Sequence, residues 1–182
     1  MKSLCTSFRL FVLLCMLAGL LFQANPVSAA TIWETVGSAG FSAGGVEYVS
    51  LAVDDECTPY VAYQDESNGD EATVMKFNGS AWETVGHEGF TSAGVEYISL
   101  AVDGSGTPYV AFRDIFRGYK AAVMKYDGSY WVSIGGATIS ADEAWYTSLA
   151  LDGSGMPYVA YQDYANGSKA TVMKFNGSSW ET

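Results

Sequence analysis

Histidine, cysteine and basic residues are scarce in this chain of 182 residues. The sequence contains one histidine, three cysteines and nine lysines or arginines, against 20 aspartates or glutamates. Because a zinc site needs several histidine or cysteine ligands, so small a supply excludes a zinc centre. The net charge of −11 at pH 7 repels nucleic acids and anionic membrane surfaces, and it leaves cations, basic proteins and neutral sugars as partners.

Long hydrophobic runs are also lacking, with one exception near the N-terminus. Lys2 and Arg9 precede 13 apolar residues at positions 10–22, and the small residues of positions 27–29 follow them. This order is typical of a secretory signal peptide, whereas a membrane anchor, the alternative, requires about 20 apolar residues. We therefore predict a signal peptide over residues 1–29 and a secreted, extracellular or cell-surface protein over 30–182, with no membrane insertion after cleavage.

Cleavage at that site changes the remaining composition. It removes Cys5 and Cys15, so that Cys57 is the one cysteine left and an internal disulfide is excluded. It also removes Lys2 and Arg9, which leaves seven basic residues against 20 acidic ones and a net charge of −13. The exported chain is therefore strongly acidic and folds without a disulfide.

Nearly the same sequence occurs three times with a fixed period. Tyrosine, proline, methionine and tryptophan recur every 49 residues, as Tyr48, Tyr97 and Tyr146 illustrate, and no gap is needed anywhere. A strict period of this length indicates a solenoid, a propeller or an array.

Each repeat contains four short runs rich in β-branched and aromatic residues, separated by Gly, Asn, Asp and Pro. We call these runs strands a, b, c and d, and in the second repeat they cover 97–102, 109–113, 122–126 and 131–134. Such runs indicate strands joined by turns. Runs a and b are apolar at nearly every position, which predicts burial on both faces.

The predicted fold is all-β and consists of β-propeller blades, that is, three four-stranded antiparallel units. The blades cover about 47–86, 96–135 and 145–182, and an extra outer strand over 32–36 precedes them. A parallel β-helix is the alternative, but its coils are shorter and the tight turns here favour hairpins. In such a meander the longer d–a and b–c loops emerge at the same end, where binding residues usually lie.

The sequence resembles a known group of proteins at two stretches of the second repeat. SLAVDGSGTPYVAFRD at 99–114 and AAVMKYDGSYW at 121–131 are similar to blades of the secreted bacterial β-propeller repeat proteins, in the broad company of NHL, kelch and seven-bladed-propeller repeats. The resemblance covers residues 33–182. It implies a ring of four to eight blades around a channel, and it implies no particular activity.

Three repeats are too few for a usual ring, so two interpretations stay open. In one, the sequence is part of a longer gene product with further blades. In the other, the chain assembles as a homo-oligomer, for instance two copies forming a six-bladed ring in which the opening strand of one copy completes the last blade of the other. Bare sheet edges favour such pairing.

Aspartates end strand b in all three repeats, as Asp65, Asp114 and Asp163. They are candidates to bind a ligand's hydroxyl groups or a cation, although a loop-fixing aspartate that accepts backbone N–H bonds is the simpler interpretation. The b–c loops that follow differ between repeats, and their aromatic and basic residues are the other binding candidates: Phe116, Arg117, Tyr119 and Tyr164.

Acidic residues also begin the a–b turns. Asp54, Asp55 and Glu56 form the densest group and are the candidate for an adventitious calcium site, although turn chemistry explains them better. No other metal site and no cofactor is predicted. Tryptophans open strand d at positions 33, 82, 131 and 180. Packing against the neighbouring blade is a better account of them than stacking on a sugar.

No catalytic residue is predicted. His87 occurs in one repeat, without a serine or cysteine partner that the sequence places beside it. Glycoside hydrolysis needs two carboxylates with opposite roles, whereas the aspartates that begin the a–b turns and end strand b are copies present in every repeat. The sequence thus predicts a non-catalytic module that binds carbohydrate or protein at the cell surface. The alternatives are a fragment of a propeller glycosidase or lyase, and a purely structural repeat array.

Overall fold

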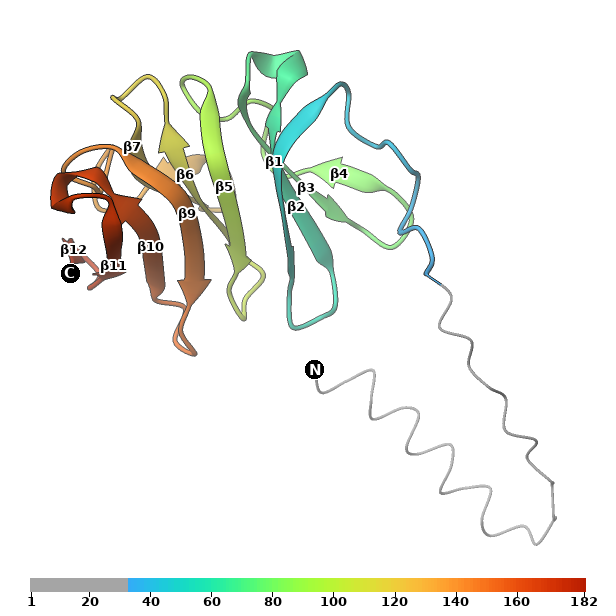
Figure 1. Cartoon of the computed structure of the whole chain (residues 1–182). Coiled ribbons are helices and arrows are strands. Elements are labelled where there is room, and N and C mark those ends of the chain that lie inside the picture. The colour runs from blue at the N-terminus through green and yellow to red at the C-terminus, as the bar shows by residue number, and fades with distance from the viewer. Residues whose placement is uncertain (1–32) are drawn as a thin grey trace, which may run out of the picture.

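The computed structural model describes residues 33–182, which form three antiparallel sheets (Figure 1). The predicted signal peptide lies outside the described residues. Each sheet has four strands, and each strand pairs with its neighbours in sequence. Within the described residues, no helix has the length and apolar character needed to cross a membrane.

The strand bounds repeat from sheet to sheet. The first sheet contains β1 (Val46–Val53), β2 (Pro59–Asp65), β3 (Glu71–Phe77) and β4 (Trp82–Thr84). The second contains β5 (Val95–Val102), β6 (Pro108–Asp114), β7 (Lys120–Tyr126) and β8 (Trp131–Ser133). The third contains β9 (Ala144–Leu151), β10 (Pro157–Asp163), β11 (Lys169–Phe175) and β12 (Trp180–Glu181). Two single-turn helices, η1 (Glu66–Asn68) and η2 (Tyr164–Asn166), lie in the loops after β2 and β10.

The three sheets stand side by side, with their first strands β1, β5 and β9 adjacent and their outer strands splayed apart (Figure 1). Each sheet is a β-propeller blade. The predicted fold class is therefore confirmed, and the four predicted strands of every repeat are present with bounds that differ by one or two residues.

Aspartate side chains close the turns between strands a and b. Oδ1 of Asp103 accepts hydrogen bonds from the backbone N–H groups of Ser105 and Thr107, both at 2.9 Å. Gly106 follows with a φ of 81°, a value that favours glycine. The same bonding recurs at Asp152 in the third repeat. Turn chemistry thus explains why every repeat has an aspartate here.

The hydrophobic core lies between the sheets. One cluster joins the first sheet to the second through residues such as Val74, Leu100 and Val110. A second cluster joins the second sheet to the third through residues such as Val123 and Leu149. The second sheet therefore packs one face against the first sheet and the other face against the third.

The predicted burial of strand a on both faces is wrong for β1. Its residues Val49, Leu51 and Val53 are 59%, 64% and 56% exposed. Leu100, the counterpart of Leu51 in β5, is 6% exposed because the first sheet covers it. In residues 33–182 no sheet precedes β1, and so its corresponding face is open.

The predicted outer strand over 32–36 is absent from its described part, residues 33–36. Strand d pairs with strand c of its own blade, as Trp82 does with Phe77 and Trp131 with Tyr126. No strand c precedes residue 33 in the described chain, and the side chain of Trp33 is fully exposed.

Trp131 and Trp180 each tie their blade to the one before it, and Trp82 ties the first blade to the segment before β1. Nε1 of each donates a 2.9 Å hydrogen bond to a backbone carbonyl that lies 46 residues earlier in the sequence. The ring of Trp131 also stacks on Phe90, with 4.1 Å between ring centroids. The prediction that the tryptophans pack against the neighbouring blade is confirmed for Trp131 and Trp180. Trp82 stacks on Phe41 of the segment before β1, and the prediction is wrong for Trp33, whose side chain is fully exposed.

A β-bulge near the start of each first strand places a tyrosine in an unusual conformation. The φ angles of Tyr48, Tyr97 and Tyr146 are 49°, 50° and 56°, where bulky residues are rarely found. Their rings form a row across the three blades, with centroids 5.1 and 4.9 Å apart. The bulge turns these rings toward one another along the innermost strands.

Candidate functional site

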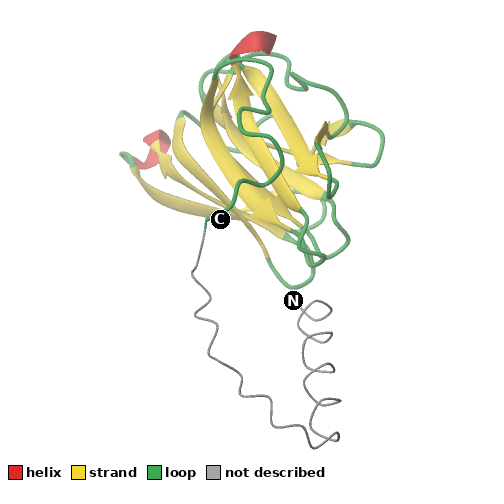
Figure 2. Cartoon of the chain, turned by 90° about the vertical axis from the view of Figure 1, so that its right-hand side faces the viewer, coloured by secondary structure: helices red, strands yellow, loops and turns green. Residues whose placement is uncertain are grey.

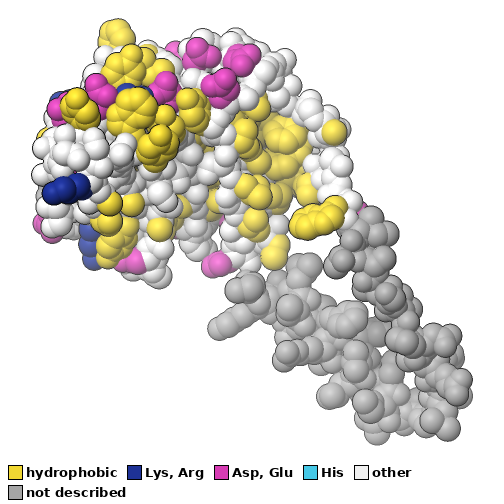
Figure 3. Space-filling view, in the orientation of Figure 1, with side chains coloured by type: hydrophobic (Ala, Val, Ile, Leu, Met, Phe, Trp, Pro, Cys, Tyr) yellow, Lys and Arg dark blue, Asp and Glu magenta, His cyan; other side chains and the backbone are white. Residues whose placement is uncertain are grey.

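The long loops of the three blades lie at one end of the strands, as predicted. Val46 at the start of β1 pairs with Asp65 at the end of β2, so the d–a and b–c loops are neighbours. The short helices also lie in loops at strand ends (Figure 2). In Figure 3, hydrophobic and acidic side chains lie together at the upper left of the molecule, over this end of the strands.

Two of the three predicted ligand-binding aspartates accept hydrogen bonds from the loop that follows them and from the next strand. Asp65 is 1% exposed. Its Oδ1 accepts a 3.1 Å bond from the N–H of Ser67, and its Oδ2 accepts bonds from Asn68 and Thr73, both at 2.9 Å. Asp163 repeats this arrangement in the third sheet. Both carboxylates therefore fix loops.

The electrostatic environment of Asp163 agrees with that role. Burial raises its pKa, but hydrogen bonds from Asn166 and Thr171 and from backbone N–H groups outweigh burial and hold the pKa below its usual value. The carboxylate stays charged and bound to its loop at neutral pH.

Asp114 has different partners because the second repeat differs from the others around it. Arg117 stands where the other repeats have Asn68 and Asn166. The backbone N–H of Arg117 donates a 2.9 Å bond to Oδ1 of Asp114, and Nη1 of Arg117 donates a 2.5 Å bond to Oδ2. The same Nη1 lies 3.1 Å from Oγ of Ser92.

Two further replacements in the second repeat remove atoms. Phe112 replaces Tyr63 and Tyr161, whose hydroxyl groups each donate a 3.3 Å hydrogen bond to a methionine sulfur. Ala122 replaces Thr73 and Thr171, whose hydroxyl groups donate to the buried aspartates. The second sheet therefore lacks two hydroxyl groups and a methyl group that fill this space in its neighbours.

A cavity of about 150 Å³ occupies this position in the second sheet. Its lining has an apolar part and a polar part, and consists of Phe90, Thr91, Ser92, Phe112, Asp114, Arg117, Ala122, Met124, Ser133 and Ala137. The polar part combines hydroxyl groups with the charged pair of Asp114 and Arg117. The cavity can therefore hold a small ring-shaped group and hydrogen-bond the polar atoms at its edge.

The opposite face of β6 carries a second group of residues, which we call the Arg113 cluster. Arg113 is 4% exposed. Its guanidinium bonds Oε2 of Glu96 at 2.6 Å and Oε2 of Glu143 at 3.2 Å. It lies over the ring of Trp145 at 3.7 Å and over that of Tyr119 at 4.3 Å. Among the described residues, its Nε is buried without a hydrogen-bond partner. These ion pairs and cation–π contacts fix the boundary between the second and third sheets.

The Arg113 cluster was not predicted from the sequence. Arg113 stands where the other repeats have Gln64 and Gln162, and Trp145 stands where they have Glu47 and Glu96. These departures from the repeat are the signal that the sequence offers, but they lie in predicted strands and not in the loops, where binding residues are expected.

The remaining predicted binding residues are exposed at the same end. Phe116 is 79% exposed, Tyr119 40% and Tyr164 59%, and the side chain of Arg117 is 40% exposed. Tyr146, which was not predicted, is 63% exposed. The second and third b–c loops, together with Tyr146 of β9, therefore expose aromatic rings at this end of the strands.

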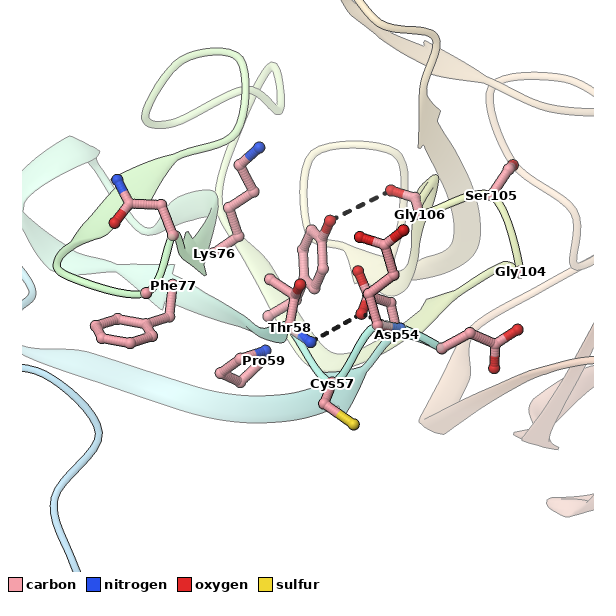
Figure 4. Close-up of a pocket in the computed structure, with 14 residues that line it drawn as sticks. Asp54, Cys57, Thr58, Pro59, Lys76, Phe77, Gly104, Ser105 and Gly106 are labelled. Carbon is pink, nitrogen blue, oxygen red and sulfur yellow. Dashed lines mark hydrogen bonds between the residues drawn. The ribbon is translucent and has the colours of Figure 1, made fainter. Parts of the chain in front are cut away.

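The acidic turn at the other end of the first sheet borders a separate cleft (Figure 4). Oδ1 of Asp54 accepts bonds from the N–H groups of Glu56 at 2.9 Å and Thr58 at 2.8 Å, and the hydroxyl of Tyr60 lies 3.4 Å from the carbonyl of Gly106. Nowhere in residues 33–182 do three His, Cys, Asp or Glu side chains come together as a metal would require. The calcium candidate at Asp54, Asp55 and Glu56 therefore has no ligand cluster in the described chain.

Comparison with known proteins gives neither a family nor a curated relative. No protein-family model matches the chain, and no curated protein sequence matches it. Solved structures that are similar include a fucose lectin from Kordia zhangzhouensis in complex with methyl-fucoside, at 18% identity and a TM-score of 0.48. That match covers 73% of this chain and 95% of the lectin chain.

Two enzymes are similar to the same extent. A Hadza microbial sialidase is 15% identical with a TM-score of 0.48, over 75% of this chain and 32% of the sialidase. An exo-1,5-α-L-arabinanase from a bovine ruminal metagenomic library is 16% identical with a TM-score of 0.47, over 87% of this chain and 65% of the enzyme. The chain thus spans less than two thirds of either enzyme, and none of these similarities is close enough to assign an activity to it.

Proposed function

We propose that this protein is a secreted, non-catalytic carbohydrate-binding module and that its ligand site is the cavity of the second sheet. The observation that carries the proposal is the concerted replacement at Phe112, Arg117 and Ala122. These changes remove side-chain atoms that the first sheet has at this position, and the cavity of the second sheet lies there with a guanidinium at its edge.

The size of the cavity supports a monosaccharide unit as the bound group. A cavity of about 150 Å³ is large enough for one six-membered ring, since an engineered cavity of that volume binds benzene. Drug-sized ligands occupy sites of roughly 300 Å³ or more. A single terminal sugar ring is therefore a better match than a larger cofactor or an extended peptide.

The chemistry of the lining supports the same ligand class. A pyranose has C–H groups that pack on apolar side chains and hydroxyl groups that need both donors and acceptors. Phe112 and Met124 offer the apolar contact, Arg117 donates hydrogen bonds, and Asp114 accepts them. The exposed ring of Phe116, in the loop between these two charged residues, is available to stack on a second sugar unit.

Binding without turnover is supported by the number of carboxylates. A glycosidase uses two carboxyl groups that flank the scissile bond. Among the described residues that line the cavity, Asp114 is the one acidic side chain, and it is held by Arg117. Export from the cytoplasm rests on the signal peptide predicted over residues 1–29.

The test is a glycan array probed with the purified, labelled protein, followed by titration of the best ligand. The decisive variant is Phe112→Tyr with Ala122→Thr, which restores the residues of the first repeat and fills the cavity. We expect glycan binding by the wild type and at least a tenfold loss of affinity in the double variant, whose folded structure is retained. Tyr130→Ser, at an exposed turn outside the cavity lining, is the matched control.

Three outcomes would contradict the proposal. Equal binding by the double variant would place the site elsewhere. Release of a hydrolysed product would favour the glycosidase alternative, and silence on the array would favour a structural repeat array.

A further inference from the structure

The first sheet has an open apolar face, which we call the leading face. It is formed by Val49, Leu51 and Val53 of β1, all more than half exposed. The counterparts of the first two in β5, Ile98 and Leu100, are 7% and 6% exposed because the first sheet covers them. In Figure 3 hydrophobic side chains gather over the first sheet, on the right of the described chain.

The third sheet has an open face of the opposite kind, which we call the trailing face. It is formed by Tyr158 and Ala160 of β10 and by Ala170 and Val172 of β11, and Val172 is 55% exposed. The corresponding residues of the first sheet are buried against the second sheet: Tyr60 is 6% exposed, and Ala62, Ala72 and Val74 are fully buried.

The two internal boundaries use the same hydrogen bonds. At the first boundary the N–H of Leu100 donates a 3.0 Å bond to Oγ of Ser50, and at the second the N–H of Leu149 donates a 2.9 Å bond to Oγ of Ser99. The next donor and acceptor in this series are the N–H of Leu51 on the leading face and Oγ of Ser148 beside the trailing face. Ser148 is exposed.

The d–a loops add a second repeated bond. Thr91 accepts a 3.0 Å bond from the N–H of Ala72, and Ser140 accepts a 2.9 Å bond from the N–H of Ala121. Both hydroxyl groups donate to a carbonyl two residues later. Ser42, the counterpart in the loop before β1, makes the same donation to Gly44 at 2.9 Å, so its oxygen is already oriented as an acceptor. The matching donor is the N–H of Ala170 on the trailing face.

We propose that the leading face docks on the trailing face of a second copy of this chain, and that two copies close a six-bladed ring. Leu51 would pack against Val172 of the second copy, as Leu100 packs in one cluster with Val74. Two chains of three blades give six, within the four to eight blades that propellers use, whereas three chains give nine. The proposal rests on the open faces and is independent of the ligand in the cavity.

The residues at the new boundary are compatible with the close approach of two acidic chains. Gln162 stands where the first sheet has Gln64, whose side-chain amide donates a 2.8 Å bond to the carbonyl of Val95. Val46 supplies the corresponding carbonyl. At this position the proposed boundary thus repeats the amide–carbonyl contact of the first boundary and not the second, where Arg113 pairs with two glutamates.

β12 determines which residues of a second copy can contact the third sheet. Trp180 and Glu181 already pair with β11 in the outer-strand position of the third sheet, so residues 33–35 of a second copy have no place to fill there. The contact would instead begin at Val36. Its counterparts Val85 and Ile134 donate their N–H groups to Val74 and Val123 at 2.8 and 3.0 Å.

The test is the molar mass of the purified chain in solution, measured by light scattering after size-exclusion chromatography. We expect twice the mass of one chain. Leu51→Lys and Val172→Glu each put a charge on one exposed face without touching a single copy's core, and each variant is expected to be a monomer. Tyr130→Lys, an exposed turn residue outside both faces, is the control that remains dimeric.

Mixing the two monomeric variants provides the sharper measurement. In a mixed ring one boundary places the introduced lysine of one chain beside the introduced glutamate of the other, and the second boundary is wild type. The mixture is therefore expected to regain the doubled mass, while neither variant does so alone. A monomeric wild type, or variants that keep the doubled mass, would overturn the proposal. Two folded monomers that fail to combine when mixed would overturn it as well.

Discussion

Nε1 of Trp131 donates a 2.9 Å hydrogen bond to the carbonyl oxygen of Val85, at the boundary between the first two sheets. The indole is 7% exposed and its ring stacks on Phe90. Trp131→Phe keeps an aromatic ring but leaves this buried carbonyl without its donor, which costs about 1–3 kcal/mol. We expect urea unfolding to show a loss of stability of that size. Trp33→Phe, at a fully exposed ring, is the control, and a comparable loss there would show that the bond to Val85 is not responsible.

Cys57 occupies a backbone position that the other repeats give to glycine. Its φ is 65°, and those of Gly106 and Gly155 are 81° and 80°. A side chain at such an angle is strained by roughly 1–3 kcal/mol, whereas glycine adopts it freely. We expect Cys57→Gly to raise the free energy of unfolding by about 1 kcal/mol, since the entropy of glycine in the unfolded chain offsets part of the relief. Cys57→Ala removes the thiol but keeps the strain, so an equal gain in that variant would contradict the explanation.

Tyr63 and Tyr161 are expected to make stability sensitive to alkaline pH. Burial, with the charges of Asp65 and Asp163 added, raises the pKa of both hydroxyls to about 12, from an ordinary value of 10.0. Because the folded pKa is the higher one, the stabilising contribution is complete below pH 10 and is lost as the pH rises toward 12. The double variant with phenylalanine at both positions should lose less stability between about pH 9 and pH 11 than the wild type does. Guanidinium unfolding at both pH values measures this, and parallel losses in the two proteins would refute it.

Asp163 has the opposite sign of pH dependence. Its folded pKa lies below the ordinary value of a carboxyl group, so its contribution is complete above that value, about 3.9, and is lost as the pH falls through the folded pKa. Asp163→Asn keeps a side-chain acceptor for the loop but cannot titrate. We expect the variant to be less stable than the wild type near neutral pH, and the difference to shrink on acidification below about pH 4. Thermal unfolding followed by circular dichroism across this range is the measurement, and a difference that does not vary with pH would count against the assignment.

The sequence alone predicts the strands and their connections because every element is present three times. The pattern predicts strand b of the second repeat over 109–113, and the structure has it as β6, Pro108–Asp114. The period also identifies Trp82, Trp131 and Trp180 as packing residues, since a large ring at a fixed blade position has a neighbouring blade to contact. The turns between strands a and b are predictable as well, because Asp103 accepts hydrogen bonds from residues only two and four positions later in the sequence.

The candidate site is harder to predict from the repeat pattern. Phe112 differs from Tyr63 by one hydroxyl group, and its importance depends on Ala122, which lies on another strand. The Arg113 cluster joins side chains from two repeats, so no single repeat contains it. The exposure of β1 is also hidden, because a strand's hydrophobicity does not reveal whether a partner sheet is present. These features arise from combinations of residues distant in the sequence.

The contacts between neighbouring sheets are made by residues that every repeat contains, such as the serine of strand a and the tryptophan of strand d. Slippage or unequal recombination in the gene that adds or deletes one unit of 49 residues would therefore yield a chain whose sheets still stack. The number of units can therefore change while the sequence of each unit stays the same.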